Sequence, residues 1–271
     1  MPDLSSVLLA WGRPTGSPAV SLATLDRILD AIARLHALFR REGSAAAPPG
    51  FPWCPIRERL LLLSPPAAEG YRGAGNPVGE RFLAGWDAFA RRAPRAAVEL
   101  VDRLAADPDP LLRALGRLPA TGLHGDLKLA NVGLSGAGEV LLIDWQMATF
   151  APVAVELGWL LVSNAAELPI PSGAVLDRYR KAAGRAVAVT DGSAAGTGAP
   201  VAADEAETSV DRLLGDWSAQ VDLAWIVGLL LRGWRKGLDA EAGVRLGSGM
   251  DAADDLRAWC RRAVEAAERR L

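Results

Sequence analysis

The sequence predicts a mainly α protein with one small β-hairpin. Apolar residues recur at helical spacing along most of the 271-residue chain. One apolar run, Val140–Ile143, is short enough to be a strand, and the glycine-containing connection at residues 135–139 suits a tight turn before it. We therefore expect helices throughout, with a single hairpin inserted near the middle of the chain.

The composition is that of a globular protein. Hydrophobic residues make up 50% of the chain and charged residues 23%, and 271 residues suffice for one large domain or two small ones. A formal net charge of −2 without a basic stripe argues against nucleic acid as a partner. Cys54 and Cys260 lie far apart, so they predict neither a metal site nor a disulfide framework.

The sequence shows no targeting signal. The N-terminus lacks a basic start followed by a long apolar run, and the most apolar later segment, Leu223–Leu231, is too short to span a bilayer. We therefore predict a cytoplasmic protein with no membrane partner, and leave its oligomeric state open.

The first helix is predicted over residues 22–41. Ser21 can cap it, and apolar residues follow at helical spacing: Leu22, Leu25, Leu29, Ile32, Leu35 and Phe39. His36 lies on or near this stripe, which favours a packed histidine over a ligand. Residues 1–20 contain Pro2, Pro14, Gly16 and Pro18, which break regular structure, so they predict an irregular lead-in.

Further helices are predicted on both sides of the hairpin. Before it they cover residues 56–63, 80–105 with a break near Pro94, and 111–118. After it they begin near Val153 and cover residues 208–237 and 252–270, with the tryptophans as core packing. Residues 190–207 are low in complexity and predict a mobile loop.

The segment Thr121–Trp145 contains the polar residues that packing does not explain. Asp126 and Asn131 lie in the loop HGDLKLAN, and the predicted hairpin would return Asp144 to the same point. Carboxylate and amide oxygens suit Mg²⁺ carrying phosphates, and a spare carboxylate suits a proton acceptor. Lys128 could contact a phosphate oxygen as a point charge.

The motif HGDLKLAN followed by IDW resembles the aminoglycoside phosphotransferase and choline kinase-like family, whose members are relatives of the protein kinases. The resemblance implies that Asp126 is the catalytic aspartate and that Lys128 contacts the transferred phosphate. It further implies that Asn131 and Asp144 hold the metal. Mg²⁺ and ATP, or GTP, are the implied cofactors.

The resemblance also implies a fold and supporting residues. His124, Trp145 and Glu156 would brace the site, although the family typically has an aspartate where Glu156 stands. The implied fold is the C-terminal lobe of a protein-kinase-like α+β fold over residues 21–271, after a hinge-like lead-in at 1–20.

The family's N-terminal nucleotide lobe is predicted to be absent from this sequence. Such a lobe, with five strands and one helix, needs roughly 80 residues. Only about twenty residues precede the first predicted helix, and none of residues 1–127 is a lysine. We expect a misplaced start or a fragment, with an inactive relative as the alternative.

The predicted function is ATP-dependent transfer of a phosphoryl group to a hydroxyl of a small molecule, with the chain as written truncated and inactive. The alternative is a non-catalytic, kinase-like binding module. A metal-dependent hydrolase is less favoured, because few histidines and carboxylates cluster near the motif. The chemical class of the acceptor is left open. By resemblance, family members directed at aminoglycosides tend to have acidic acceptor pockets, and those directed at choline tend to have aromatic cages.

Overall fold

A computed structural model describes residues 7–9, 20–40, 49–194 and 210–271. The α-helices are α1 (Leu22–Leu38), α2 (Ile56–Leu61), α3 (Pro65–Glu69), α4 (Pro77–Arg92), α5 (Arg95–Ala106), α6 (Asp109–Leu115), α7 (Val153–Ser163), α8 (Ser172–Ala194), α10 (Trp217–Glu241) and α11 (Ala252–Arg270). The short strands are β1 (Thr121–Leu123), β2 (Val132–Leu134), β3 (Val140–Leu142) and β4 (Thr149–Ala151), and single 3₁₀ turns are η1 (Leu129–Asn131) and η2 (Trp145–Met147). The prediction of a mainly α protein with a small hairpin is confirmed.

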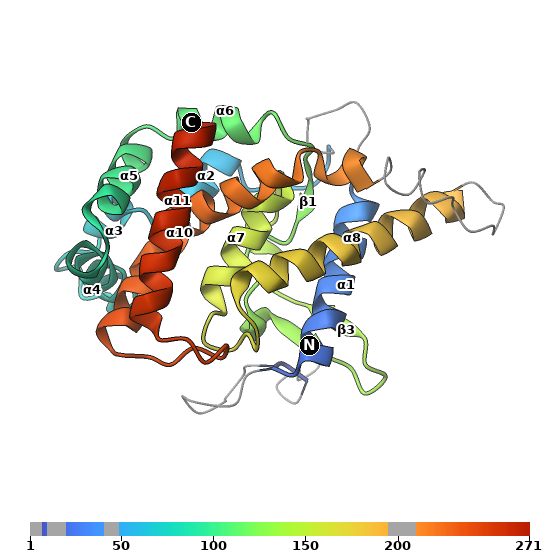
Figure 1. Cartoon of the computed structure of the whole chain (residues 1–271), viewed down its shortest axis with the longest axis horizontal. Helices are drawn as coiled ribbons and strands as arrows, with labels where there is room; N and C mark the ends of the chain where they lie inside the picture. The colour runs from blue at the N-terminus through green and yellow to red at the C-terminus, as the bar shows by residue number, and fades with distance from the viewer. Residues whose placement is uncertain (1–6, 10–19, 41–48, 195–209) are drawn as a thin grey trace.

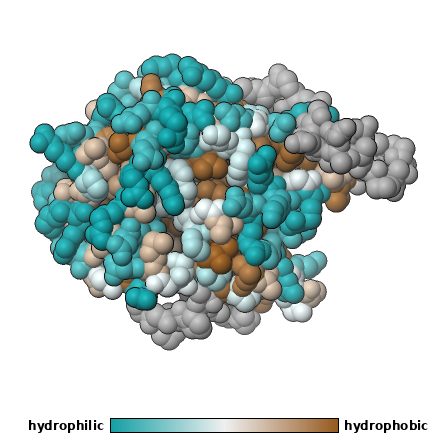
Figure 2. All heavy atoms as spheres, viewed as in Figure 1, coloured by the Kyte–Doolittle hydropathy of each residue, from teal (hydrophilic) through white to brown (hydrophobic). Residues whose placement is uncertain are grey.

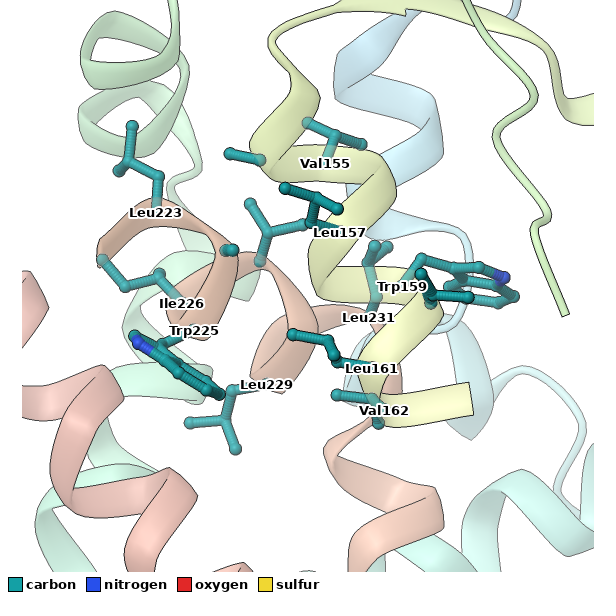
Figure 3. Close-up of a cluster of buried hydrophobic side chains, with 14 of the residues drawn as sticks. Val155, Leu157, Trp159, Leu161, Val162, Leu223, Trp225, Ile226, Leu229 and Leu231 are labelled. Carbon is teal, nitrogen blue, oxygen red and sulfur yellow. The ribbon is translucent and has the colours of Figure 1, made fainter. Parts of the chain in front are cut away.

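The core is built on α7 and α10, which pack against each other while α4 and α11 cover α10 (Figure 1). Figure 3 shows their apolar side chains meeting, among them Leu157 and Leu161 from α7 and Ile226 and Leu229 from α10. The helices approach closely because a glycine stands at the crossing. A Cβ added at Gly158 would lie 2.6 Å from the Ala224 carbonyl oxygen.

A second helical pair is formed by α1 and α8, which lie side by side (Figure 1). Ion pairs between Arg178 and Asp26 and between Arg185 and Asp30 join their exposed faces. Helix α8 was not predicted, because much of its buried face is alanine, a weak hydrophobic signal. The predicted loop at 190–207 is therefore wrong for residues 190–194, which belong to α8, and its remainder lies outside the described residues.

The strands form two antiparallel ribbons. β2 and β3 make the predicted hairpin, with Val132 opposite Leu142. β1 pairs with β4 and places Leu123 opposite Thr149, a ribbon that was not predicted. Its three-residue strands are far apart in the chain, so only the tertiary fold brings them together. Of the lead-in, residues 7–9 lie along β2, where Leu8 is opposite Gly133.

Helix boundaries differ from the expected ones where caps decide them. Asn76 accepts hydrogen bonds from the N–H groups of Val78 and Gly79, so α4 begins at Pro77 rather than at residue 80. The predicted break at Pro94 separates α4 from α5. The helix predicted over 208–237 bends before Trp217, where Asp216 caps α10.

One helical run, Val210–Glu241, is long and apolar enough to cross a membrane by length and composition alone. However, 72% of its most apolar window is buried inside the protein, as in the core helix of a globular fold. Hydrophilic residues cover most of the face seen in Figure 2, with smaller hydrophobic patches between them. The absence of a membrane partner stays a prediction.

Candidate active site

The loop that follows β1 is anchored by the buried carboxylate of Glu156 on α7. Its Oε2 accepts a hydrogen bond from the His124 backbone N–H at 2.7 Å, and its Oε1 accepts one from the Gly125 N–H at 3.0 Å. The Glu156 side chain is fully buried, so these bonds form in a low-dielectric interior and hold the backbone firmly. Glu156 thus lies where the predicted bracing residue was expected.

A buried histidine supports Glu156 from α1. The His36 Nε2 lies 3.5 Å from Glu156 Oε2, and its Nδ1 lies 2.6 Å from the Tyr179 hydroxyl. Burial, with the Glu156 charge nearby, raises the pKa of Tyr179 well above its ordinary value, so this hydroxyl stays protonated. Because a carboxylate oxygen can only accept, the tautomer with its proton on Nε2 faces Glu156, and Nδ1 then accepts from the Tyr179 hydroxyl. His36 is a packed residue, as predicted.

Glu156 stays ionised although its side chain is buried. Desolvation raises the pKa of its carboxyl, but His36, His124 and the His124 backbone hydrogen bond together outweigh that effect and lower the pKa below its ordinary value. An ionised carboxylate accepts the two loop N–H groups more strongly than a neutral acid would.

Arg59 on α2 holds the same loop from its other side. Its Nε and Nη2 donate to the Gly125 carbonyl oxygen at 2.9 and 2.6 Å, and its guanidinium stacks on Trp159, 4.1 Å from the ring centre. Burial lowers the pKa of Arg59, while the charges of Asp126 and Glu156 oppose that change. This role was not predicted, because a lone arginine in a short helix carries no motif.

Asn164, just after α7, was also missed. Its Oδ1 accepts the Leu129 N–H at 2.7 Å, and its Nδ2 donates to the carbonyl oxygens of Leu160 at 2.7 Å and Leu127 at 3.3 Å. This buried amide fixes the second half of the loop, where η1 begins.

Gly125 is required by the geometry of the loop. Its φ is +80°, and a Cβ there would lie 1.8 Å from the Met147 carbonyl oxygen. We expect Gly125→Ala to lower the free energy of unfolding by at least about 2 kcal/mol, from the left-handed backbone and the backbone clash together. Urea unfolding measures this, with Gly184→Ala on α8, which has open space around it, as the control. Equal stability of the two variants would contradict the prediction.

Asp126 and Asn131 meet within the loop. Asn131 Nδ2 donates to the Asp126 carbonyl oxygen at 2.9 Å and to Asp126 Oδ2 at 3.0 Å. Lys128 Nζ donates to the same Oδ2 at 2.7 Å. One carboxylate oxygen is therefore held by two donors, while Oδ1 accepts no hydrogen bond from the residues described and remains available to a ligand.

The hairpin returns Asp144 to the loop, as predicted. The Ile143 N–H donates to the Asn131 carbonyl oxygen at 3.1 Å, and His124 Nε2 lies 2.8 Å from the Ile143 carbonyl oxygen. His124 Nδ1 accepts the Asp126 N–H at 3.3 Å, so Nε2 carries the ring proton and donates it to Ile143. The Trp145 ring packs on His124 with centres 4.7 Å apart.

Asp144 has a left-handed backbone, with φ 66° and ψ 62°, and is the one non-glycine residue with a positive φ in the described parts of the chain. Such strain tends to occur where a side chain must be aimed for function. Its exposed carboxylate has no cationic partner among the described residues.

The donor set fits a hard cation. Asn131 turns its NH₂ toward Asp126, so its Oδ1 faces away and accepts no hydrogen bond from the described residues. That oxygen and the Asp144 carboxylate are the ligand types that Mg²⁺ takes beside phosphate oxygens. Histidines, cysteines and carboxylates form no metal-binding group of three or more within the described residues, so protein ligands alone do not make a closed site.

A mainly helical body with a small hairpin beside such a loop is the fold of the C-terminal lobe of protein-kinase-like proteins. The chain belongs to the phosphotransferase enzyme family, whose model matches residues 6–195, well over half of its length. A comparison with curated proteins gave no match. The family resemblance inferred from the loop motif is confirmed, while the roles of the individual site residues remain predictions.

Proposed function

We propose that this chain transfers the terminal phosphoryl group of a nucleoside triphosphate, ATP or GTP, to a hydroxyl group of a small molecule. The observation that carries the proposal is Asp126: it lines a cavity of about 410 Å³, and its Oδ1 has no hydrogen-bond donor among the described residues while its Oδ2 has two. A carboxylate held in this way can accept one proton from an acceptor hydroxyl that enters the cavity.

The chemistry follows from these positions. The acceptor hydroxyl gives its proton to Asp126 Oδ1 as its oxygen bonds to phosphorus, and the bond from that phosphorus to the nucleoside diphosphate breaks. Lys128, which lies beside Asp126, would neutralise charge on the transferred group. Asn131 Oδ1 and Asp144 would hold Mg²⁺, which supplies positive charge to the phosphates when bound. The buried bonds to Glu156 and Arg59 keep the loop fixed meanwhile.

The proposal is tested by measuring phosphoryl transfer from Mg²⁺-ATP and Mg²⁺-GTP to a panel of hydroxylated small molecules. The full chain is compared with a longer form extended upstream of Met1. Transfer that requires both Mg²⁺ and an acceptor hydroxyl supports the proposal. Absence of transfer by both forms, with nucleotide bound and the whole panel tried, counts against it.

The proposed role of Asp144 leads to a prediction about Mg²⁺ binding. We expect Asp144→Asn to raise the Mg²⁺ concentration needed for half-maximal transfer by about tenfold or more, because a neutral amide replaces a charged ligand. The measurement is a Mg²⁺ titration of the transfer rate at fixed nucleotide. Asp254→Asn, at an exposed position on α11, should leave the titration unchanged. An unchanged titration for Asp144→Asn would remove that residue from the metal site.

A non-catalytic binding module is the second candidate. It is favoured by the strand content, because the described residues contain two two-stranded ribbons and not the larger antiparallel sheet that the kinase-like resemblance implies for nucleotide binding. Calorimetric titration with Mg²⁺-ATP separates the two cases. Nucleotide binding without transfer to any acceptor favours the module.

A further inference from the structure

The cavity beside Asp126 is bounded by side chains from several elements that are distant in the sequence. Its volume, about 410 Å³, falls in the range of small-molecule sites. Its walls include three aromatic rings and three long cations around the one carboxylate of Asp126, together with apolar side chains and one amide. A hydroxyl compound in this cavity would lie directly against the proposed proton acceptor.

The charge of the cavity is positive. Lys128 is paired with Asp126, but neither Arg59 nor Arg232 pairs with a carboxylate in the described part of the chain. Arg59 bonds to a backbone carbonyl and Arg232 Nη1 bonds to the Ser163 hydroxyl at 3.1 Å. Burial, with Arg235 nearby, lowers the pKa of Arg232 to about 10, which leaves it charged at neutral pH. Neither arginine therefore has a carboxylate partner at ion-pair distance, and the charges of Asp126, Glu156 and Asp239 act on them only from farther away.

The walls also carry unused hydrogen-bond donors. Four buried nitrogen atoms on lining side chains have no partner among the described residues: Arg59 Nη1, Trp159 Nε1, Arg232 Nε and Trp234 Nε1. Buried donors are normally paired, and these four lie on side chains that line the cavity although the atoms themselves are buried. All four donate and none accepts, so the complementary ligand is rich in acceptor oxygens.

Arg232 is held in place by the rings around it. Its guanidinium lies 4.8 Å from the ring centre of Trp159 and 4.9 Å from that of Trp234. It stands at the kink of α10, where its φ of −144° and ψ of 24° leave the helical range. A guanidinium fixed between two indoles loses little freedom when it binds an anion, so it is suited to select one.

We propose that the acceptor of this phosphotransferase is a hydroxyl compound that also carries an anionic group, a carboxylate or a phosphate ester, bound by Arg232 and Arg59. This inference rests on the proposed function. A cationic acceptor is disfavoured, because it would face two unpaired arginines in a desolvated site. Phe82 and the two indoles supply apolar surface for the rest of the molecule.

Binding to the full chain is tested with four probes that share a ring and a hydroxyl and differ in charge: para-(hydroxymethyl)benzoate, the corresponding benzamide, the corresponding benzylamine and para-(hydroxymethyl)phenyl phosphate. Calorimetry or quenching of indole fluorescence gives each Kd. We expect the anions to bind more tightly than the amide, and the amine to bind most weakly. The tighter of the two anions identifies the preferred group.

Arg232→Gln should weaken binding of the anions by about tenfold to a hundredfold and leave the benzamide unchanged, because only a charge-assisted hydrogen bond is lost. Arg95→Gln, whose side chain is 92% exposed on α5, is the control and should change nothing. Circular dichroism and urea unfolding establish that the variants are folded. Arg232→Lys should keep part of the anion preference that Arg232→Gln loses.

The outcomes separate this inference from the proposed function. Equal binding of amine and anion, no binding of either anion, or an unchanged preference in Arg232→Gln overturns the inference. Competition between the anionic probes and metal-free ATP also overturns it, because the arginines would then bind the phosphates of the donor. Preferred binding of the anions with no phosphoryl transfer to any acceptor supports the anion site and counts against the proposed function.

Discussion

Replacing Asp126 with asparagine is expected to lower the rate of phosphoryl transfer by about 10²- to 10⁴-fold, the usual contribution of a positioned proton acceptor. Asparagine has nearly the same shape but cannot take the proton of the acceptor hydroxyl. The loop should keep its conformation, since Glu156 and Arg59 hold its backbone and make no use of the Asp126 side chain. The effect should therefore appear in kcat rather than in folding.

The measurement is the initial rate of transfer at saturating Mg²⁺-nucleotide and acceptor, together with the urea midpoint of the same preparation. Asp254→Asn, exposed on α11, is the matched control and should behave like the original protein. Asp126→Asn activity within about threefold of the original would exclude Asp126 as the proton acceptor, since even a weak general base contributes more than that.

Replacing Glu156 with alanine is expected to lower the free energy of unfolding by about 3–5 kcal/mol, because each of two buried N–H donors left without its acceptor costs about 1–3 kcal/mol. The change leaves the N–H groups of His124 and Gly125 without their acceptor. It also leaves His36 Nε2 facing an empty space. Buried donors without partners and a cavity both oppose folding.

Urea unfolding followed by circular dichroism measures this difference, and Glu99→Ala, 60% exposed on α5, serves as the control. Glu156→Gln should cost less than alanine, because an amide oxygen still accepts one N–H group. A cost below about 1 kcal/mol for Glu156→Ala would show that the loop does not depend on this carboxylate.

The pH dependence of stability should change in the same variants. Burial raises the pKa of Glu156, but its histidine and backbone partners lower it further, so its folded-state pKa lies below the ordinary 4.5. Its stabilising effect is therefore complete above about pH 4.5 and is lost as the pH falls through the lower, folded-state value. Glu156→Gln removes this part of the acid-induced loss of stability.

The loop motif was predictable because its residues act through chemistry that is local in the sequence. Asp126 and Asn131 share one loop, and the short turn at residues 135–139 can only return Asp144 to that loop. Helix α11 was predictable for a similar reason, because its apolar spacing and its Asp251 cap both lie within one short stretch of sequence. The hairpin and most of the helices were therefore found from spacing alone.

The sequence by itself determined the family, and it predicted the residues that would accept the proton and hold the metal. Only the tertiary structure decided which side chains support the loop and which line the cavity beside it. Arg59, Asn164 and Arg232 reach the site from elements far apart in the chain, and no local pattern records such contacts. The β1–β4 ribbon and the alanine-rich α8 were missed for the same reason, since each is stabilised by its partner and not by its own pattern.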